Sequence, residues 1–427
     1  MSEGRGNEGI GALPSYSEFA AGVREEGAFG VLAVAKSLKA AGKDVIELEI
    51  GDSPFPTPAP AKRAAIAAIE GDQTHYCPSV GIGELRQAAA DFVSAEFGLA
   101  ANAKNIVVGA GAKIFETLFC QAFLNPGDGV LVFSPYFPTY LPNIAARGAR
   151  VRLADLKQSN AFRPDLADVE RFLAEDPRPK AIFINSPHNP TGGVATKDDL
   201  AGLADLVRGR DVAVFSDEPY CHMVWSGRHH SLLAQSGMLG QCVAAYTFSK
   251  SYSMSGWRLG FAVASEETVQ ILARLVNISL SCVPPPVQLA GAAALREAAD
   301  DRDRMMRQFH KKVRILAERM NQIEGVRCLV PDGAFYVFPW VKPIADSLAM
   351  TSQGLAMYLL EGADEHLGVA CLGGECFGAA GAGFLRLSCS EPDERLKQAV
   401  NFIQGAVARP DRASAYLASH PEYRLER

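Results

Sequence analysis

The sequence lacks the usual marks of a secreted, membrane-bound or nucleic-acid-binding protein. Its nine cysteines are scattered and include no Cys-x-x-Cys pair, which argues against a disulfide framework and for a reducing compartment. No apolar run is as long as a membrane span, and the N-terminal MSEGRGNEGIGALPSY has no apolar core typical of a signal peptide. The net charge is −6 and there is no long basic run, which disfavours nucleic acid and anionic membranes as partners. We expect a cytoplasmic protein and no metal site.

The overall composition is typical of a globular protein, because 48% of the 427 residues are hydrophobic and 21% are charged. The middle of the chain contains six short β-branched and aromatic runs, at 105–111, 129–137, 180–187, 211–218, 242–250 and 258–265. Helical patterns lie between most of them, such as 112–124 and 197–209. Apolar strands that alternate with helices predict an α/β fold, with a mostly parallel sheet covered on both faces.

The rest of the chain predicts a smaller α+β domain. A long amphipathic helix is expected at 301–324, strands at 333–341 and 383–390, and a helix at 352–368. We expect four parts: an N-terminal arm that includes part of the small domain (1–50), a large domain (51–300), the small C-terminal domain (301–407) and a polar, proline-broken tail (408–427).

Polar and aromatic side chains follow the predicted strands. In open α/β sheets, ligands bind at the carboxyl ends of the strands, so these residues are expected to meet at one edge: Lys113, Phe137, Asn189, Asp217, Tyr220 and Lys250. Each alone has a structural interpretation. Asn-Pro-Thr-Gly at 189–192 is a good turn, Asp217 could cap a helix, and Phe137 could belong to the core.

Two other motifs point to nucleotide enzymes, and neither is complete. GAGAK at 109–113 begins like a dinucleotide fingerprint, but Ile114 stands where the third glycine would be. Tyr246 and Lys250 have the Tyr-x-x-x-Lys spacing of short-chain dehydrogenases. That pair belongs on a helix, where residues four apart share a face, whereas Tyr246 ends a predicted strand. We therefore disfavour both interpretations.

Four segments together resemble a known family: SPHNPTGG, SDEPY, FSKSYSMSGWRLGF and FLRLS. In this order and spacing they are similar to the fold-type-I pyridoxal-phosphate aminotransferases, the class I/II or aspartate/aromatic aminotransferase superfamily. The resemblance covers roughly residues 45–405. It implies a three-layer αβα large domain of the PLP-transferase type I with a smaller α+β domain, pyridoxal 5′-phosphate as cofactor, and a homodimer.

The resemblance also implies roles for the residues around the cofactor ring. Lys250 would form the Schiff base with the cofactor aldehyde and later move the proton between the substrate α-carbon and the cofactor C4′. Asp217 would keep the pyridine nitrogen protonated, so that the ring accepts electrons. Asn189 and Tyr220 would hydrogen-bond the 3-oxygen. Phe137 would stack on the ring, where many relatives have tryptophan.

The cofactor phosphate and the substrate carboxylate have implied partners as well. The backbone amides of Ala112 and Lys113, at a helix start, would bind the phosphate with Ser249 and Arg258. Tyr76 would reach the phosphate from the partner subunit. Arg386 would bind the substrate α-carboxylate, assisted by Asn189 and by the backbone of Gly51. Around Gly51 the sequence is Gly-Asp-Ser-Pro, a departure from the commoner Gly-Glu-Pro-Asp-Phe pattern.

The implied reaction is transamination between an L-amino acid and a 2-oxo acid of the 2-oxoglutarate type. Lys113 favours an acidic amino donor, whereas Phe29 and Leu32 favour an aromatic or neutral one. Two alternatives remain: another α-carbon reaction on the same cofactor, such as β-elimination or ring closure, and a catalytically silent ligand-binding relative. The second usually has a helix-turn-helix extension or lacks the lysine, and Lys250 is present here.

Overall fold

The computed structural model describes residues 14–23 and 26–425. The remainder of the expected N-terminal arm, residues 1–13 and 24–25, and the last two residues of the tail lie outside the described residues. No helix in the described part is long and apolar enough to cross a membrane.

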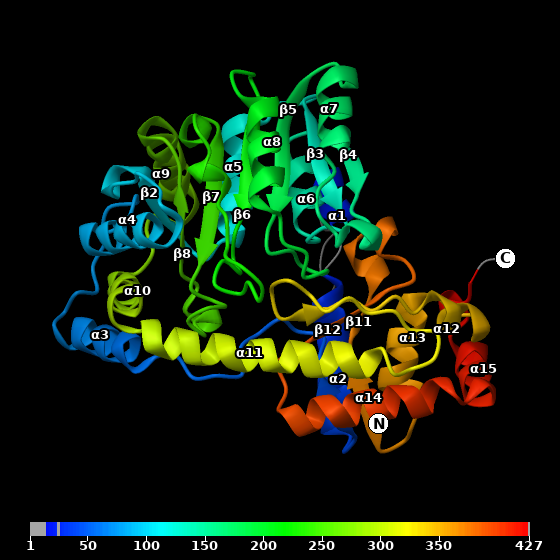
Figure 1. The fold of residues 1–427 in the computed structure, drawn as a ribbon. Helices are drawn as coiled ribbons and strands as arrows, with labels where there is room; N and C mark the ends of the chain where they lie inside the picture. Colours follow the sequence, from blue (N-terminus) through cyan, green and yellow to red (C-terminus); the bar gives the residue numbers. More distant parts are fainter. Residues whose placement is uncertain (1–13, 24–25, 426–427) are drawn as a thin grey trace, which may run out of the picture.

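A seven-stranded sheet forms the centre of the molecule (Figure 1). Its strands, in spatial order, are β2 (Ile106–Gly109), β8 (Gly260–Val263), β7 (Cys242–Thr247), β6 (Ala213–Asp217), β5 (Pro179–Asn185), β3 (Gly129–Ser134) and β4 (Arg150–Asp155). Strands β7, β6, β5, β3 and β4 run parallel to one another, whereas β8 is antiparallel to its two neighbours β2 and β7. The predicted mostly parallel sheet is confirmed.

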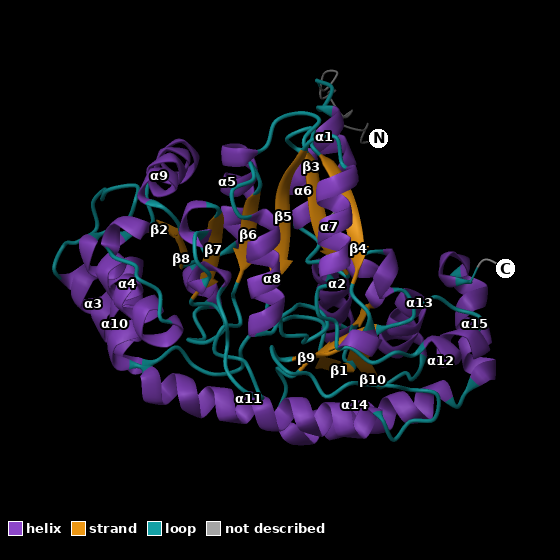
Figure 2. Cartoon of the chain, turned by 45° about the horizontal axis from the view of Figure 1, so that its top comes forward, coloured by secondary structure: helices purple, strands orange, loops and turns teal. Residues whose placement is uncertain are grey.

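Helices cover both faces of this sheet (Figure 2). One apolar cluster packs strand residues such as Phe183 and Phe215 against α5 (Lys113–Phe123), α6 (Tyr140–Ala145) and α9 (Glu266–Leu280). The other cluster packs the opposite strand residues against α4 (Gly83–Phe97), α7 (Leu166–Glu175), α8 (Lys197–Val207) and α10 (Pro285–Glu297). Continuous apolar strands need cover on both sides, and the result is the expected three-layer α/β architecture.

A second group of elements lies at the carboxyl ends of the central strands. It contains a three-stranded sheet, β11 (Leu372–Gly373), β12 (Leu385–Ser388) and β9 (Tyr336–Val337), and the parallel pair β1 (Asp44–Glu47) and β10 (Leu367–Ala370). Its helices are α2 (Gly27–Ala40), α12 (Lys342–Ser347), α13 (Ser352–Met357) and α14 (Asp393–Val407). The N-terminal β1 thus pairs with a strand from the C-terminal part of the chain.

The remaining helices connect or border these parts. The long helix α11 (Ala299–Met320) runs beneath the central sheet in Figure 1, with α14 alongside it. Helix α3 (Ala59–Glu70) packs on α10, and the short α1 (Glu18–Gly22) precedes α2 in the N-terminal segment.

Three segments differ from the sequence-based expectation. The helix expected at 352–368 is α13 followed by a π-helical turn at Tyr358–Gly362, after which the chain becomes strand β10. The strand expected at 333–341 has only the two residues of β9. The proline-broken tail contains helix α15 (Pro410–Ser419), because Pro410 stands in the first turn, where a missing N–H costs nothing.

Candidate active site

A cavity of about 420 Å³ opens between the central sheet and the smaller sheets. It is lined by residues that follow β2, β3, β5, β6 and β7, together with residues from the N-terminal segment and from β9 and β12. This is the position that the strand-end rule predicts for a ligand site. The expected site residues on the lining are Gly51, Ala112, Lys113, Phe137, Asn189, Asp217, Tyr220, Ser249, Lys250, Arg258 and Arg386.

Lys250 lies in the turn directly after β7, and its side chain faces this cavity. Its Nζ donates a hydrogen bond of 2.6 Å to the backbone oxygen of Gly51. Burial lowers the pKa of Lys250 to about 8, the charge of Asp52 works against this shift, and the cations Arg386 and Arg258 add to it. The amine is therefore closer to its neutral, nucleophilic form at neutral pH than an exposed lysine is.

Asp217 is the last residue of β6 and is buried at the floor of the cavity. The Tyr140 hydroxyl donates to its Oδ2 at 2.6 Å. Burial raises the pKa of Asp217 to about 7, while the Tyr140 hydrogen bond lowers it. A cation placed beside such a buried carboxyl stabilises its ionised form and lowers its pKa.

Glu116 is a second carboxyl on the cavity lining, one turn into α5. The Thr139 hydroxyl donates to its Oε2 at 2.5 Å, and the Asn143 amide donates to the same oxygen at 3.3 Å. Burial, and next the charge of Asp217, raises the pKa of Glu116 well above its usual range. Both effects disfavour the ionised form of Glu116 beside Asp217.

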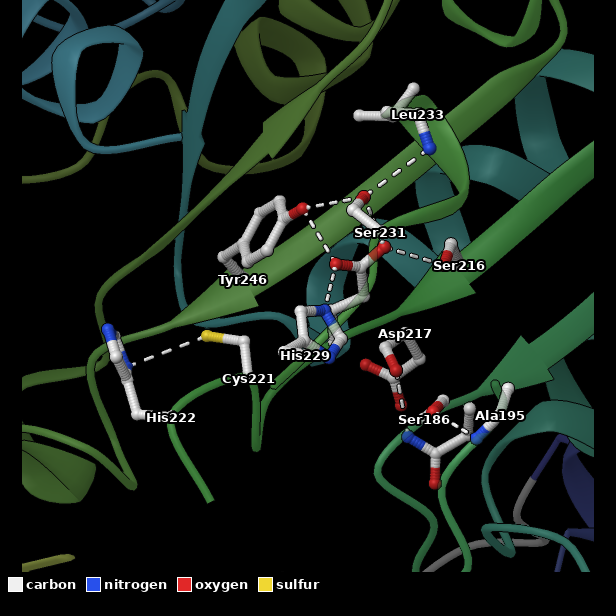
Figure 3. A network of polar contacts seen from close by, with 12 residues as sticks. Ser186, Ala195, Ser216, Asp217, Cys221, His222, His229, Ser231, Leu233 and Tyr246 are labelled. Carbon is white, nitrogen blue, oxygen red and sulfur yellow. Dashed lines mark hydrogen bonds and ion pairs between the residues drawn. The ribbon is translucent and has the colours of Figure 1, made fainter. Parts of the chain in front are cut away.

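Behind Asp217 the next residue, Glu218, is held in a buried network. Its carboxylate accepts hydrogen bonds from Ser216, Ser231 and Tyr246 at 2.8, 2.9 and 2.7 Å, and His229 Nε2 lies 2.7 Å from Oε2. Figure 3 shows these side chains converging from β6, β7 and the loop between them. Tyr246 lies on strand β7, and its hydroxyl is hydrogen-bonded to Glu218. Tyr246 and Lys250 therefore do not form the helical Tyr-x-x-x-Lys pair of a short-chain dehydrogenase.

Asn189 and Arg386 are in direct contact across the cavity. Arg386, on β12, is buried and donates from Nη1 to Asn189 Oδ1 at 3.1 Å and from Nη2 to the backbone oxygen of Glu49. Its guanidinium carbon lies 4.6 Å from the Tyr336 ring centroid and 5.0 Å from that of Phe377. Arg386 Nε has no hydrogen-bond partner in the described part of the chain. A buried guanidinium with free hydrogen-bonding capacity is suited to a planar carboxylate.

Tyr220 and Gly51 meet at Tyr336. The two tyrosine hydroxyls are 3.0 Å apart. A Cβ at Gly51 would lie 1.9 Å from the Tyr336 hydroxyl, so any other residue there would have to displace the Tyr336 side chain.

The start of α5 forms one end of the cavity. Gly111, with a φ of 83°, turns the chain into the helix, and a Cβ there would lie 2.7 Å from Arg258 Nη2. Arg258 is exposed and donates to the backbone oxygens of Ser255 and Ala110. Ser249 is buried and bonds Thr247 at 2.9 Å. Free helix N–H groups, a hydroxyl and a guanidinium are what a phosphate requires.

Lys113 lies over the face of Phe137, with Nζ 5.1 Å from the ring centroid. The same Nζ forms an ion pair of 2.8 Å with Glu26, at the start of α2. Ala28 and Phe29 of α2 also line the cavity, whereas Leu32 does not.

Tyr76, like Leu32, is an expected site residue that does not line this cavity. It lies in the loop between α3 and α4, with 91% of its surface exposed.

Sequence reasoning missed four residues of the site: Glu26, Glu116, Tyr140 and Tyr336. Tyr140 stands three residues after Phe137, and a second aromatic residue after the β3 strand end was the available signal. Nothing in the local sequence marks Glu26 or Tyr336, because their place in the site depends on distant segments.

Residues 43–403 match the family model for aminotransferase class I and II. An aspartate aminotransferase of Pyrococcus abyssi is 33% identical over 85% of this chain and 91% of its own. The aromatic-amino-acid aminotransferase 2 of Thermococcus litoralis is 32% identical over 84% of this chain and 91% of its own. The structure of a Thermus thermophilus aspartate aminotransferase with maleate has a TM-score of 0.86 at 30% identity, and covers 92% of this chain and 100% of its own.

The chain therefore belongs to the class I and II aminotransferase family, which confirms the resemblance. It is a pyridoxal-phosphate-dependent transaminase that transfers an amino group between an amino acid and a 2-oxo acid. The residues fit this cofactor. The cavity combines a lysine with a lowered pKa, a buried carboxyl and a helix start beside a guanidinium.

Proposed function

We propose that this protein transfers the amino group of an acidic or aromatic L-amino acid to a 2-oxo acid of the 2-oxoglutarate type, with Lys250 as the residue that bonds the cofactor. The observation that supports this most directly is that Lys250, Asp217 and Arg386 all line the same cavity. Bound pyridoxal phosphate supplies an aldehyde that takes up the amino group and a protonated ring that accepts electrons from the substrate α-carbon.

Lys250 acts twice in this proposal. Its Nζ, with a pKa lowered to about 8, is sufficiently neutral to attack the aldehyde carbon. After the substrate amine replaces it, the same Nζ would take the proton from the substrate α-carbon and deliver it to the cofactor C4′ within the same half-reaction, and the reverse half-reaction would run the transfer backwards.

Asp217 would hold the proton on the ring nitrogen of the bound cofactor. A protonated ring nitrogen beside it would stabilise the Asp217 anion and offset the burial that raises its pKa. The Tyr140 hydrogen bond keeps the carboxylate in position. Asn189 and Tyr220 hydrogen-bond the 3-oxygen, and Phe137 packs on the ring face.

Four groups bind the phosphate: the backbone amides of Ala112 and Lys113, the Ser249 hydroxyl and the Arg258 guanidinium. The exposure of Arg258 in this single chain suits a group whose charge is neutralised by the phosphate dianion. Tyr76, which is 91% exposed, is assigned to the phosphate in the other subunit of a homodimer, where burial would give its ring a partner.

Arg386 binds the substrate α-carboxylate, with Asn189 and the Gly51 backbone beside it. The stacking of Arg386 on Tyr336 and Phe377 fixes the plane of its guanidinium before a substrate arrives, which reduces the entropy lost on binding.

The substrate side chain meets Lys113, Glu26 and Phe29. Lys113 can pair with a second carboxylate, and the faces of Phe29 and Phe137 can pack against an aromatic ring. We therefore assign both donor classes to this site, as the similarity to aspartate and aromatic aminotransferases also suggests.

The proposal also assigns a role to each part of the chain. Residues 51–300 form the cofactor-binding domain, 301–407 with part of 1–50 form the small domain that contributes Arg386, and 408–427 are a tail. We assign the protein to the cytoplasm, where its free thiols are stable.

A half-reaction tests this function. Holoenzyme mixed with L-glutamate or L-phenylalanine, without a 2-oxo acid, should form one equivalent of pyridoxamine phosphate per site and then stop until 2-oxoglutarate is added. Lys250→Ala should not form it at a comparable rate. Continuous turnover with release of ammonia would contradict transamination and indicate elimination.

A further inference from the structure

Glu49 is a buried carboxyl that the proposed reaction does not use. It lies two residues after β1 and two before Gly51. Its side chain is completely buried, and among residues 14–23 and 26–425 neither Oε1 nor Oε2 has a hydrogen-bond partner. An unpartnered carboxyl is costly to bury, above all as an anion, so its retention in this position needs an explanation.

Glu49 is adjacent to Arg386. The backbone oxygen of Glu49 accepts a hydrogen bond from Arg386 Nη2. The other contacts of the guanidinium are the Asn189 side chain and the Tyr336 and Phe377 rings. The positive charge of Arg386 favours ionisation of Glu49, and Arg386 also lines the cavity, where a ligand can reach it.

The charged groups around Glu49 come from every neighbouring segment. Glu47 on β1 and Glu391 before α14 oppose its ionisation, and Arg386 on β12 favours it. Lys39 on α2 is paired with Glu47 at 2.6 Å. Cys371, between β10 and β11, is a neutral thiol whose pKa burial raises. Burial is the largest effect, and it raises the pKa of Glu49 to about 7.

We propose that Glu49 is a positioning residue for Arg386 that takes up a proton when a substrate carboxylate binds there. This inference rests on the proposed role of Arg386. In the free enzyme, ionised Glu49 partly balances the buried guanidinium. When a carboxylate binds Arg386, a second anion enters the same buried region, and repulsion between the two favours the protonated form of Glu49.

The sign of the pH dependence follows from linkage. The pKa of Glu49 is higher in the complex than in the free enzyme. Below about pH 7 the group is already protonated, so binding takes up no proton. Above that pH, binding takes up a proton, and affinity for the carboxylate falls by as much as about tenfold per pH unit.

The test compares wild-type holoenzyme with Glu49→Gln, which keeps the shape but cannot titrate. The probe is 3-phenylpropionate or succinate, whichever binds more tightly, because neither has an amino group that reacts. We expect equal dissociation constants at about pH 6 and about tenfold tighter binding by Glu49→Gln at about pH 8.5. Glu47→Gln, a neighbouring carboxylate that is partly exposed, should match wild type within about twofold at both pH values.

Infrared difference spectra give a second measurement that uses the unaltered protein. Probe binding at about pH 8 should produce the carbonyl band of a protonated carboxyl group in wild type and no such band in Glu49→Gln. Parallel pH profiles of the two proteins, uniformly weaker binding by Glu49→Gln, or the absence of the band in wild type would each overturn the inference.

Arg386→Gln separates this inference from the proposed function. If Arg386→Gln loses probe affinity at every pH while Glu49→Gln behaves like wild type, only the role of Glu49 is wrong. If Arg386→Gln binds the probe as wild type does, the carboxylate site itself is wrong, and the Glu49 inference falls with it.

Discussion

At the scale of single residues, Lys113 is a cation for which two anions compete in the proposed site. One is the Glu26 carboxylate, and the other is the side-chain carboxylate of an acidic substrate. Lys113 Nζ is 2.8 Å from Glu26, and the two side chains are 45% and 15% exposed. If Lys113 binds the substrate side chain as proposed, a dicarboxylic substrate must compete with Glu26 for it, whereas an aromatic substrate can leave the pair intact. Glu26 would then restrain the enzyme's preference for acidic donors.

Removing this competitor should change donor selectivity. We expect Glu26→Gln to raise kcat/KM for aspartate and glutamate by about two- to fivefold, which is the effect of losing a partly exposed ion pair. kcat/KM for phenylalanine should stay the same. The measurement is initial rates with each donor at one fixed 2-oxoglutarate concentration.

Glu18→Gln serves as the matched control, because Glu18 is an exposed carboxylate outside the cavity. It should leave the donor ratio unchanged. An equal loss of activity toward acidic and aromatic donors in Glu26→Gln would show that Glu26 supports the site without selecting between substrates.

At the scale of elements, local sequence was informative where one periodicity continued over a whole element. The six apolar runs became strands because each is buried on both faces. Strand β4 was missed because RVRLAD lies at the sheet edge, is largely exposed and contains charges. The helix expected at 352–368 ends early because the chain from Leu367 pairs with β1, more than 300 residues away in sequence.

The tail helix α15 is the clearest case of an element stabilised by packing. Its buried face consists of Ala413, Tyr416 and Leu417, and the Tyr416 hydroxyl donates to Glu361 at 2.6 Å. Ten residues are too few for a stable isolated helix, so the contact with the rest of the chain maintains it.

Substitution of the buried face should therefore destabilise the protein without affecting catalysis. Leu417→Ala is expected to lower the free energy of unfolding by about 2–4 kcal/mol, the usual result of truncating a buried leucine. Urea denaturation at fixed protein concentration measures this change, and kcat at low temperature should equal that of wild type.

Ser414→Ala, on the exposed face of the same helix, provides the comparison and should change the stability by less than about 0.5 kcal/mol. If the two variants had the same stability, α15 would not be packed as described.

At the scale of the whole molecule, the proposed site is divided between subunits. Tyr76 does not line the cavity of its own chain, and the proposal assigns it to the other site of the dimer. Tyr76 could serve either the site of its own subunit or the site of the partner subunit. Mixed dimers of a Lys250 variant and a Tyr76 variant distinguish these two arrangements.

Lys250→Ala subunits mixed with Tyr76→Ala subunits should regain activity at limiting cofactor. In the hybrid, the subunit with intact Lys250 receives an intact Tyr76 from its partner, so one of the two sites is wild type. The measurement is the rate at limiting pyridoxal phosphate after dissociation and reassociation of the two variants.

His75→Ala, which alters the adjacent exposed residue, should retain cofactor as wild type does. If the hybrids were no more active than the average of their parents, Tyr76 would act within its own subunit or not at all.

The sequence by itself determined six of the seven strands of the central sheet, the family and the residues that follow these strands, because strand periodicity and short motifs are local. Lys250, Asp217 and Asn189 could be found in this way. Only the tertiary structure decided what surrounds them. Arg386 meets the backbone of Glu49 across 337 positions of sequence, and Lys113 meets Glu26 across 87. Burial and the charges of distant segments set the pKa values of Lys250, Asp217 and Glu49, and neither is visible until the chain is folded.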